Sequence, residues 1–394
     1  MNGTIYMPVG EACSSISDTY REKKNMVTLI NTSDVLEGRV LNHERVPNSN
    51  LKGQFKKTFQ RDDILYSEIR PQNRRFAYVD FSPIDYIAST KLMVIRAKKD
   101  VVSPKYLYYF LKNTSTVAEL QLLAETRSGT FPQITFSEVA NLTIPVPSLA
   151  VQEVIVQTMQ CLEDKITCNE QINDNLQQQA QAIYHERFET VSPNDLPSNW
   201  RIVTLGEVAA ISNKSFNPLK EPEILLEHYS IPAFDEAKFP VFELSTSIKS
   251  NKFIIDALCF MISKLNPTTK RVWKPYCLTG NAVCSTEFIV YKAKDKSITN
   301  FLYSVIDSSS FSDFMCSHVT GSTGSRQRTT PSDTLSYELI LPSEDELEEF
   351  QSLVSPMYAQ IRINAIENDK LKRLRDSLLP KLMSGEIDVS AVQL

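Results

Sequence analysis

Four polar loops carry the side chains of this sequence that are best suited to contacts with nucleic acids. Arginine and lysine match guanine O6 and N7 and phosphate oxygens, asparagine and glutamine match adenine N6 and N7, and small residues let the backbone approach phosphate. The candidates in the first two loops are Arg70, Gln72, Asn73, Arg74 and Arg75, and Arg127, Ser128, Thr130 and Gln133. Those in the other two are Lys264, Asn266, Thr268, Lys270 and Arg271, and Ser322, Thr323, Arg326, Gln327 and Arg328. Taken singly, each also fits a solvated basic loop.

Motifs of catalysis do not accompany these loops. An adenine methyltransferase needs an Asn/Asp-Pro-Pro-Tyr/Phe loop, and neither Asn217-Pro-Leu nor Asn266-Pro-Thr fits. No Gly-x-x-x-x-Gly-Lys phosphate loop occurs among ten glycines, and four scattered histidines provide no Ser/His/Asp arrangement. Asp62, Asp63 and Glu68 are conceivable metal ligands, but we favour a solvated strand edge. The sequence therefore predicts a chain that is not an enzyme and has no cofactor or metal of its own.

Composition is that of an ordinary globular protein. The chain has 394 residues, 42% of them hydrophobic and 23% charged, which is enough for two or three domains with their own cores. Without a long apolar run or the pattern of a signal peptide, we expect no membrane contact and a cytoplasmic location. The seven cysteines form no Cys-x-x-Cys and the histidines have no ligand spacing, so we expect buried free thiols.

Charge is distributed unevenly along the chain. Residues 1–147 hold 19 Lys+Arg against 15 Asp+Glu, and residues 200–342 hold 15 against 14. Residues 148–199 hold 2 against 8, and residues 343–394 hold 6 against 10. The net charge of −5 thus comes from two acidic segments, while the loop-bearing segments are slightly positive. That distribution is compatible with DNA binding.

The sequence repeats itself at an offset of about 195 residues. Val9–Ile16 recurs as Leu205–Ile211, and Ser89–Ile95 recurs as Ser285–Tyr291. The polar loops fall at corresponding places in the two copies, whereas their residues differ. This correspondence favours a recognition function over a solvated loop.

Each copy reads as a mixed α/β domain. The expected strands are Phe76–Val79, Leu92–Ile95, Phe253–Ile255 and Glu287–Tyr291. A helix should begin after Ser103-Pro104, with a counterpart at Asn300–Ser308. We place a first recognition domain at 1–147, a central helix at 148–190, a linker and second domain at 191–342, and a C-terminal helix and tail at 343–394.

Two long helices with heptad seams must position these domains. One seam runs from Gln152 to Arg187 and the other from Leu347 to Leu382, and each has two asparagines near its middle. We expect an antiparallel pair within one chain, in which Asn169, Asn173, Asn364 and Asn368 fix the register, although a plain structural hairpin or a dimer contact also fits. Pro356 should kink the second helix or start it afresh.

The duplicated plan and three segments resemble a known family. Leu371–Asp388, Leu225–Phe234 and Asp63–Pro71 are similar to segments of the DNA-specificity (S) subunits of type I restriction–modification systems. The resemblance covers nearly the whole chain. It implies two recognition domains separated by antiparallel helices, each reading one part of a split, asymmetric double-stranded DNA target. It also implies two methyltransferase subunits, which would use S-adenosylmethionine, and restriction subunits as partners.

Two other readings remain open at this point. In the first, the duplicated domains bind protein and the helices form a scaffold; in the second, the chain is a stand-alone enzyme. If the helices act as a ruler, about 36 residues at ~1.5 Å each span roughly 54 Å. The target bases and the spacer length are not readable from the residues.

Overall fold

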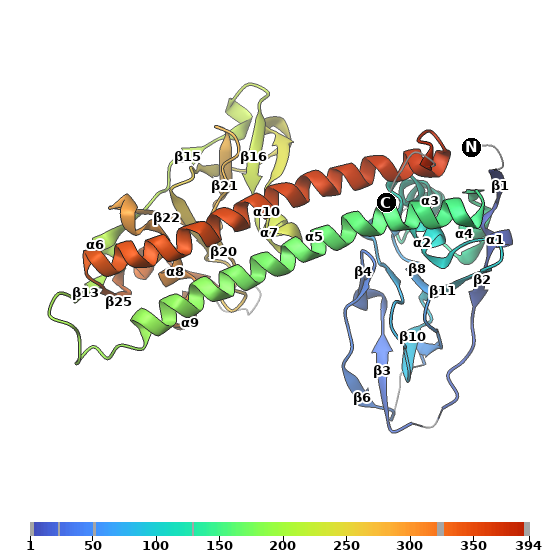
Figure 1. The fold of residues 1–394 in the computed structure, drawn as a ribbon, viewed down its shortest axis with the longest axis horizontal. Coiled ribbons are helices and arrows are strands. Elements are labelled where there is room, and N and C mark those ends of the chain that lie inside the picture. The colour runs from blue at the N-terminus through green and yellow to red at the C-terminus, as the bar shows by residue number, and fades with distance from the viewer. Residues whose placement is uncertain (1–3, 23, 50–52, 128–129, 321–326, 390–394) are drawn as a thin grey trace. The chain divides into compact units, whose positions relative to one another are not determined.

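The computed structural model describes residues 4–22, 24–49, 53–127, 130–320 and 327–389. Ser128, Ser322, Thr323 and Arg326 lie outside the described residues. Two compact units make up the fold, one from residues 1–166 and 370–394 and the other from residues 167–369. Each unit contains one copy of the repeat and a part of both long helices, and each is described by itself below (Figure 1).

The first unit is built on two four-stranded sheets. An antiparallel sheet has the order β2(Cys13–Ile16)-β11(Leu92–Ala97)-β8(Ile64–Ser67)-β9(Phe76–Tyr78). A mixed sheet has the order β6(Arg45–Pro47)-β3(Met26–Ile30)-β10(Tyr86–Ser89)-β7(Phe55–Lys57), with β3 and β10 parallel. Two-stranded pairs are β1(Ile5–Pro8)-β12(Thr143–Val146) and β4(Val35–Leu36)-β5(Arg39–Val40). The short helices are α1(Val9–Ala12), α2(Pro104–Lys112), α3(Thr114–Arg127) and α4(Phe136–Asn141).

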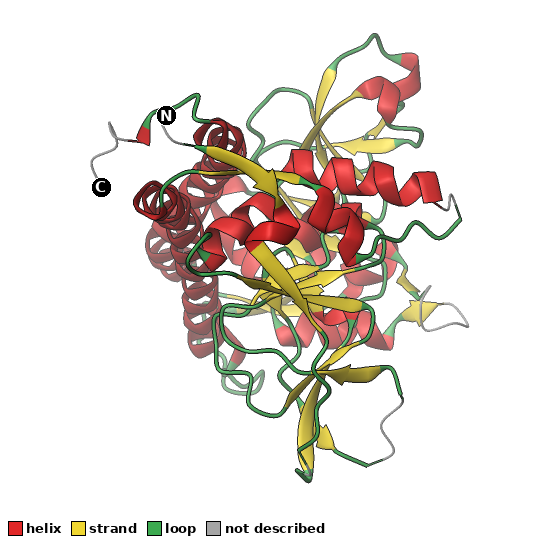
Figure 2. Ribbon diagram, turned by 90° about the vertical axis from the view of Figure 1, so that its right-hand side faces the viewer, coloured by secondary structure: helices red, strands yellow, loops and turns green. Residues whose placement is uncertain are grey.

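The second unit repeats this plan. Its antiparallel sheet has the order β14(Ala209–Ile211)-β22(Phe288–Ala293)-β19(Cys259–Ser263)-β20(Val272–Trp273). Its mixed sheet has the order β15(Ser215–Phe216)-β18(Lys252–Ile254)-β21(Ala282–Ser285)-β16(Leu225–Tyr229)-β17(Val241–Leu244), with β16 and β21 parallel. Two-stranded pairs are β13(Arg201–Thr204)-β25(Glu338–Leu341) and β23(Val319–Thr320)-β24(Arg328–Thr329). The short helices are α6(Leu205–Val208), α7(Ile231–Ala237), α8(Thr299–Ile306) and α9(Ser309–Ser317). Loops join the strands in both copies (Figure 2).

The repeated Gly-Glu motif has a packing reason. A Cβ at Gly10 in α1 would lie 3.0 Å from the Cβ of Ala140, and one at Gly206 in α6 would lie 3.2 Å from that of Leu335. Both separations are shorter than ordinary van der Waals contact, so a side chain at either position would push the helix away from its neighbour. Glycine at this place keeps each copy's first helix on its core.

The long helices are α5(Leu149–Tyr184), extended by the π-helical turn η3(His185–Glu189), and α10(Glu344–Ser384). Three acidic residues in the first turn of α10 suit the positive end of the helix dipole, and Gly385, with φ +77°, ends it. In each unit the beginning of one long helix packs with the end of the other, so the pairing is antiparallel: the first core joins Ile155 to Leu382, and the second joins Phe350 to Tyr184. The predicted mixed α/β fold with two long helices is confirmed.

Two expectations about single residues are wrong, and for a third one alternative is excluded. Helix α10 runs unbroken through Pro356, so of the two alternatives there, a kink or a fresh start, the fresh start is excluded. Asp63 is not at a solvated edge, because its carboxylate is fully buried and accepts two 2.7 Å bonds from Arg96. Not every thiol is buried, since Cys161 and Cys168 are exposed on α5. For Asp63 the outcome is decided by Arg96, which is 33 residues away in sequence.

Candidate nucleic-acid interface

In the first copy, the turn after β8 joins the two predicted loops through main-chain bonds. Ile69 and Gln133 form an isolated antiparallel bridge. The amide of Arg70 donates to the carbonyl of Pro132 at 3.0 Å, and the amide of Asn73 donates back to the carbonyl of Arg70 at 2.9 Å. The polar residues 70–73 therefore sit on a turn whose shape is fixed by the backbone.

The second copy repeats the turn bond for bond. Leu265 and Arg328 form the corresponding bridge. The amide of Asn266 donates to the carbonyl of Gln327 at 2.9 Å, and the amide of Thr269 donates to the carbonyl of Asn266 at 2.8 Å. The structure thus brings the two loops of each copy together.

The first residue of both turns has the same unusual backbone conformation. Arg70 has φ +46° and Asn266 has φ +48°, in the left-handed region that side chains rarely adopt. The bonds above hold each residue there against a cost of roughly 1–3 kcal/mol. Such strain at equivalent places in two copies marks both turns as functional candidates.

Several predicted residues of the first copy are used inside the domain. Arg74 donates to Thr114 Oγ1 at 3.1 Å and faces Glu37, and Arg75 donates to the carbonyl of Ser33 at 3.0 Å. Arg127, the last residue of α3, pairs with Glu138 at 2.6 Å, and Gln133 accepts from Lys91 at 3.3 Å. These side chains hold the turn and its surroundings in place.

The cations of the second copy are paired in the same way. Arg271 donates two bonds to Asp235, at 2.6 and 2.9 Å. Lys270 pairs with Asp307 at 2.7 Å, and Arg328 donates two bonds to Glu287, at 3.0 and 3.1 Å. The Oδ1 atom of Asn266 is buried without a hydrogen-bond partner in the described part of the chain.

A smaller set of predicted residues is turned to solvent. Arg70, Gln72 and Asn73 are exposed, and within the described residues their side chains make no hydrogen bond or ion pair. Thr130 and Thr268 are exposed as well, and Lys264 is partly exposed. Among the predicted arginines of the first copy, Arg70 is thus the one whose guanidinium is left available for a ligand.

Four asparagines of the helix seams meet inside the second unit. Asn169 donates to Asn368 Oδ1 at 2.8 Å and to Glu367 Oε2 at 2.7 Å. Asn364 donates to Asn173 Oδ1 at 2.9 Å. Asn169, Asn364 and Asn368 are at most 6% exposed, so these amides form a buried polar layer.

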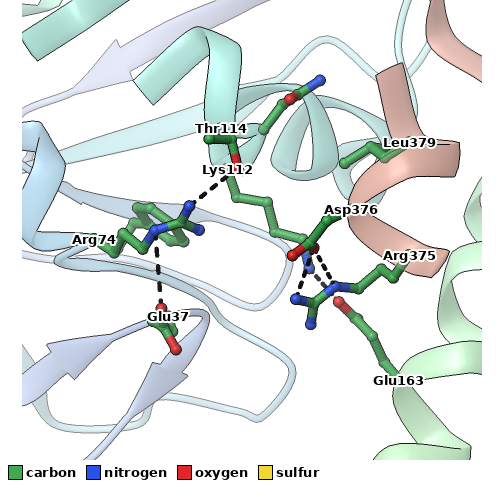
Figure 3. Close-up of a pocket in the computed structure, with 10 residues that line it drawn as sticks. Glu37, Arg74, Lys112, Thr114, Glu163, Arg375, Asp376 and Leu379 are labelled. Atoms are coloured by element: carbon green, nitrogen blue, oxygen red, sulfur yellow. Dashed lines mark hydrogen bonds and ion pairs between the residues drawn. The ribbon is translucent and has the colours of Figure 1, made fainter. Parts of the chain in front are cut away.

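The sequence reasoning missed the contacts that dock each domain on a helix. In the first unit Lys112 of α2 forms an ion pair with Glu163 of α5 beside a small polar pocket (Figure 3). In the second unit Lys274 lies 4.9 Å from the ring of Tyr358 of α10, and burial lowers the pKa of Lys274 to about 8. Neither lysine lies in a sequence motif. The one available signal was for Lys112, a charged residue at the end of a helix whose other residues are mostly apolar.

Comparison with known proteins identifies the family. The family model of the type I restriction modification DNA specificity domain matches residues 13–178. The specificity subunit of the type I restriction enzyme HindI from Haemophilus influenzae is 30% identical over 433 residues, which cover 92% of this chain and 94% of that protein. This chain belongs to the type I restriction–modification specificity subunits. The MjaIX specificity subunit from Methanocaldococcus jannaschii is 27% identical over 344 residues, covering 78% of this specificity subunit and 76% of that one.

Solved structures share the fold of this specificity subunit. The S subunit of a type I restriction-modification system from M. genitalium matches with a TM-score of 0.53 and 15% identity, covering 97% of this chain and 96% of that one. A chain from a study of complex assembly and conformational transition of the type I R-M system matches with a TM-score of 0.50 and 18% identity, covering 98% and 99%.

Family membership makes the chain a DNA-recognition subunit, and the alternative of a protein-interaction scaffold without DNA specificity is not favoured. Its family role is a non-catalytic one. Within the described residues no cluster of metal ligands occurs, and no helix is both long and apolar enough to cross a membrane.

Proposed function

We propose that each of the two repeated domains reads one part of a split, asymmetric double-stranded DNA target. The observation that carries this proposal is the repeated turn, which has the same main-chain bonds in both copies but contains Arg70 in one and Asn266 in the other. Two domains that recognise different bases need different side chains, and they can hold those side chains on the same backbone turn.

Arg70, Gln72 and Asn73 are the reading residues of the first copy in this proposal. Arginine recognises guanine through O6 and N7, and glutamine or asparagine recognises adenine through N6 and N7. Their exposure supports this assignment, and so does the lack of side-chain partners for them within the part of the chain that the structure describes. In the second copy Lys264, Asn266 and Thr268 occupy the corresponding turn.

The long helices set the distance between the two parts of the target, and two methyltransferase subunits dock on the complex. Those subunits carry S-adenosylmethionine and methylate adenine, and restriction subunits join them to cut unmodified DNA. The specificity subunit itself does no chemistry. We place the assembly in the cytoplasm, together with its DNA.

Methylation mapping in a host that expresses the subunit with its cognate methyltransferase tests the proposal. A bipartite target is expected, and exchanging residues 200–342 for another recognition domain should change one part only. If both parts change, the division of reading is refuted.

A matched pair of variants tests the reading turn. Arg70→Ala should weaken binding of the target by about 10- to 100-fold, the effect of one lost bidentate base contact. Arg127→Ala removes an arginine that is paired with Glu138, and it should change binding much less. Gel-shift titration at fixed salt measures both, and equal effects would contradict the assignment.

A further inference from the structure

The two domains dock on the long helices through equivalent positions of the repeat. In the first unit α2 meets α5 at Glu163, and in the second α8 meets α10 at Tyr358. Glu163 and Tyr358 are 195 residues apart, and so are Tyr109 and Ser304, which contact them. The same place in the fold therefore carries different chemistry in the two copies.

The large side chain of this contact belongs to the recognition domain in the first unit and to the long helix in the second. The hydroxyl of Tyr109 donates to Glu163 Oε2 at 2.9 Å, so the domain supplies the large ring. Ser304 Oγ and the hydroxyl of Tyr358 lie 3.2 Å apart, so there the helix supplies it. Tyr109 and Ser304 are both fully buried. Tyr109 placed against Tyr358 would overfill the contact, and Ser304 placed against Glu163 would leave a void.

Charge is reversed at the neighbouring position. Lys112 pairs with Glu163 (Figure 3). Its ammonium lies 4.4 Å from the ring of Tyr109, and only 13% of its side chain is exposed. The residue 195 positions later is Asp307, which accepts a 2.6 Å bond from Gln177 of α5. A domain carrying Asp307 would bring a carboxylate to Glu163, where Lys112 supplies an ammonium.

We propose that these two contacts form a key that matches each recognition domain to its own helix, so that a chain with the two domains exchanged is less stable. The key is a property of folding and does not depend on DNA. Its consequence for the target, a fixed order of the two half-sites, rests on the proposed function above.

Variants of the full chain test the key in the first unit. Glu163→Tyr places a second ring against Tyr109 and removes the partner of Lys112, and the thermal midpoint should fall by about 5 °C or more. Adding Tyr109→Ser and Lys112→Asp installs the side chains of the second copy and should recover at least half of that loss. Glu153→Tyr, at an exposed site of the same helix, is the matched control. A Glu163→Tyr variant as stable as the control, or a triple variant no better than Glu163→Tyr, overturns the proposal.

A chain in which residues 9–146 and 205–341 exchange places tests the order directly. The reversed chain should unfold at a lower temperature than the same chain with Glu163→Tyr and Tyr358→Glu. The proposal fails if the two substitutions bring no gain, or if the reversed chain equals the wild type. If neither reversed chain folds, the proposal is judged on the Glu163→Tyr variant, the triple variant and the Glu153→Tyr control described above. Absence of a bipartite target in the wild type would refute the proposed function and leave the key intact.

Discussion

The buried asparagine layer leads to a prediction whose size follows from its contacts. Asn169→Ala removes one bond to the neutral amide of Asn368 and one to the carboxylate of Glu367, at 2.8 and 2.7 Å. A neutral bond contributes about 1 kcal/mol and a bond to a charged group about 1.5–3 kcal/mol. Since Asn368 is only 6% exposed, solvent will not replace the lost donor fully. We expect the free energy of unfolding of the second unit to fall by about 2.5–4 kcal/mol.

The double variant Asn169→Leu with Asn368→Leu should behave differently. Replacing both amides by apolar groups removes a buried donor together with its acceptor, so the double variant should be more stable than Asn169→Ala. The asparagines would then serve register rather than stability, as a buried asparagine does in other coiled coils. Gln178→Ala, at an exposed site of the same helix, should have an effect within about 0.5 kcal/mol.

Tryptophan fluorescence is the assay of choice, because both tryptophans, Trp200 and Trp273, belong to the second unit. Urea titrations followed at this signal report unfolding of that unit without the first. The reasoning is refuted if Asn169→Ala matches Gln178→Ala, or if the double leucine variant is less stable than Asn169→Ala.

Three further predictions concern other parts of the chain. Burial lowers the pKa of Lys274 to about 8, so above that pH the unfolded chain binds more protons than the folded one, and stability rises with pH. Relative to Lys274→Met, the wild type should gain about 1.1 kcal/mol per pH unit between about pH 8.5 and 9.5 in urea titrations, and a difference that does not change with pH would contradict this. Asp63→Ala leaves the guanidinium of Arg96, one-third exposed, without its buried partner, and calorimetry should show a loss of about 3 kcal/mol that Arg96→Leu added to it partly restores. Four residues added to α5 near Asn169 and four to α10 near Asn364 lengthen each helix by ~6 Å, and methylation mapping should find the spacer longer by a base pair or more; an unchanged spacer speaks against the ruler.

The parts of the fold that could be predicted from sequence are those with a periodic pattern. Both seams predicted long helices, and the helix after Ser103-Pro104 was found at Pro104–Lys112. The local sequence pattern did not predict where strands end or that α10 continues through Pro356, because both depend on packing against residues far away in sequence. The repeat was legible because two copies of one fold must keep the same turns and close approaches, such as those at Gly10 and Gly206.

Candidate site residues were predictable as a group but not one by one. Composition marked the loops, yet it does not distinguish Arg70, which is exposed, from Arg74 and Arg271, which are tied to partners in their own domains. That distinction depends on Thr114 and Asp235, each more than 30 residues away in sequence. The docking contacts at Lys112 were invisible for the same reason.

The proposed recognition of DNA and the proposed matching of domains to helices rest on different kinds of bond, main-chain bonds in the first case and side-chain contacts in the second. The turns that we propose to read DNA are held by main-chain bonds, which do not depend on their side chains, so Arg70 can be replaced by another residue without loss of these bonds. The docking contacts are made by side chains, and there a change on one side requires a matching change on the other. If both proposals hold, the bases that are read can vary while each recognition domain keeps its own docking position.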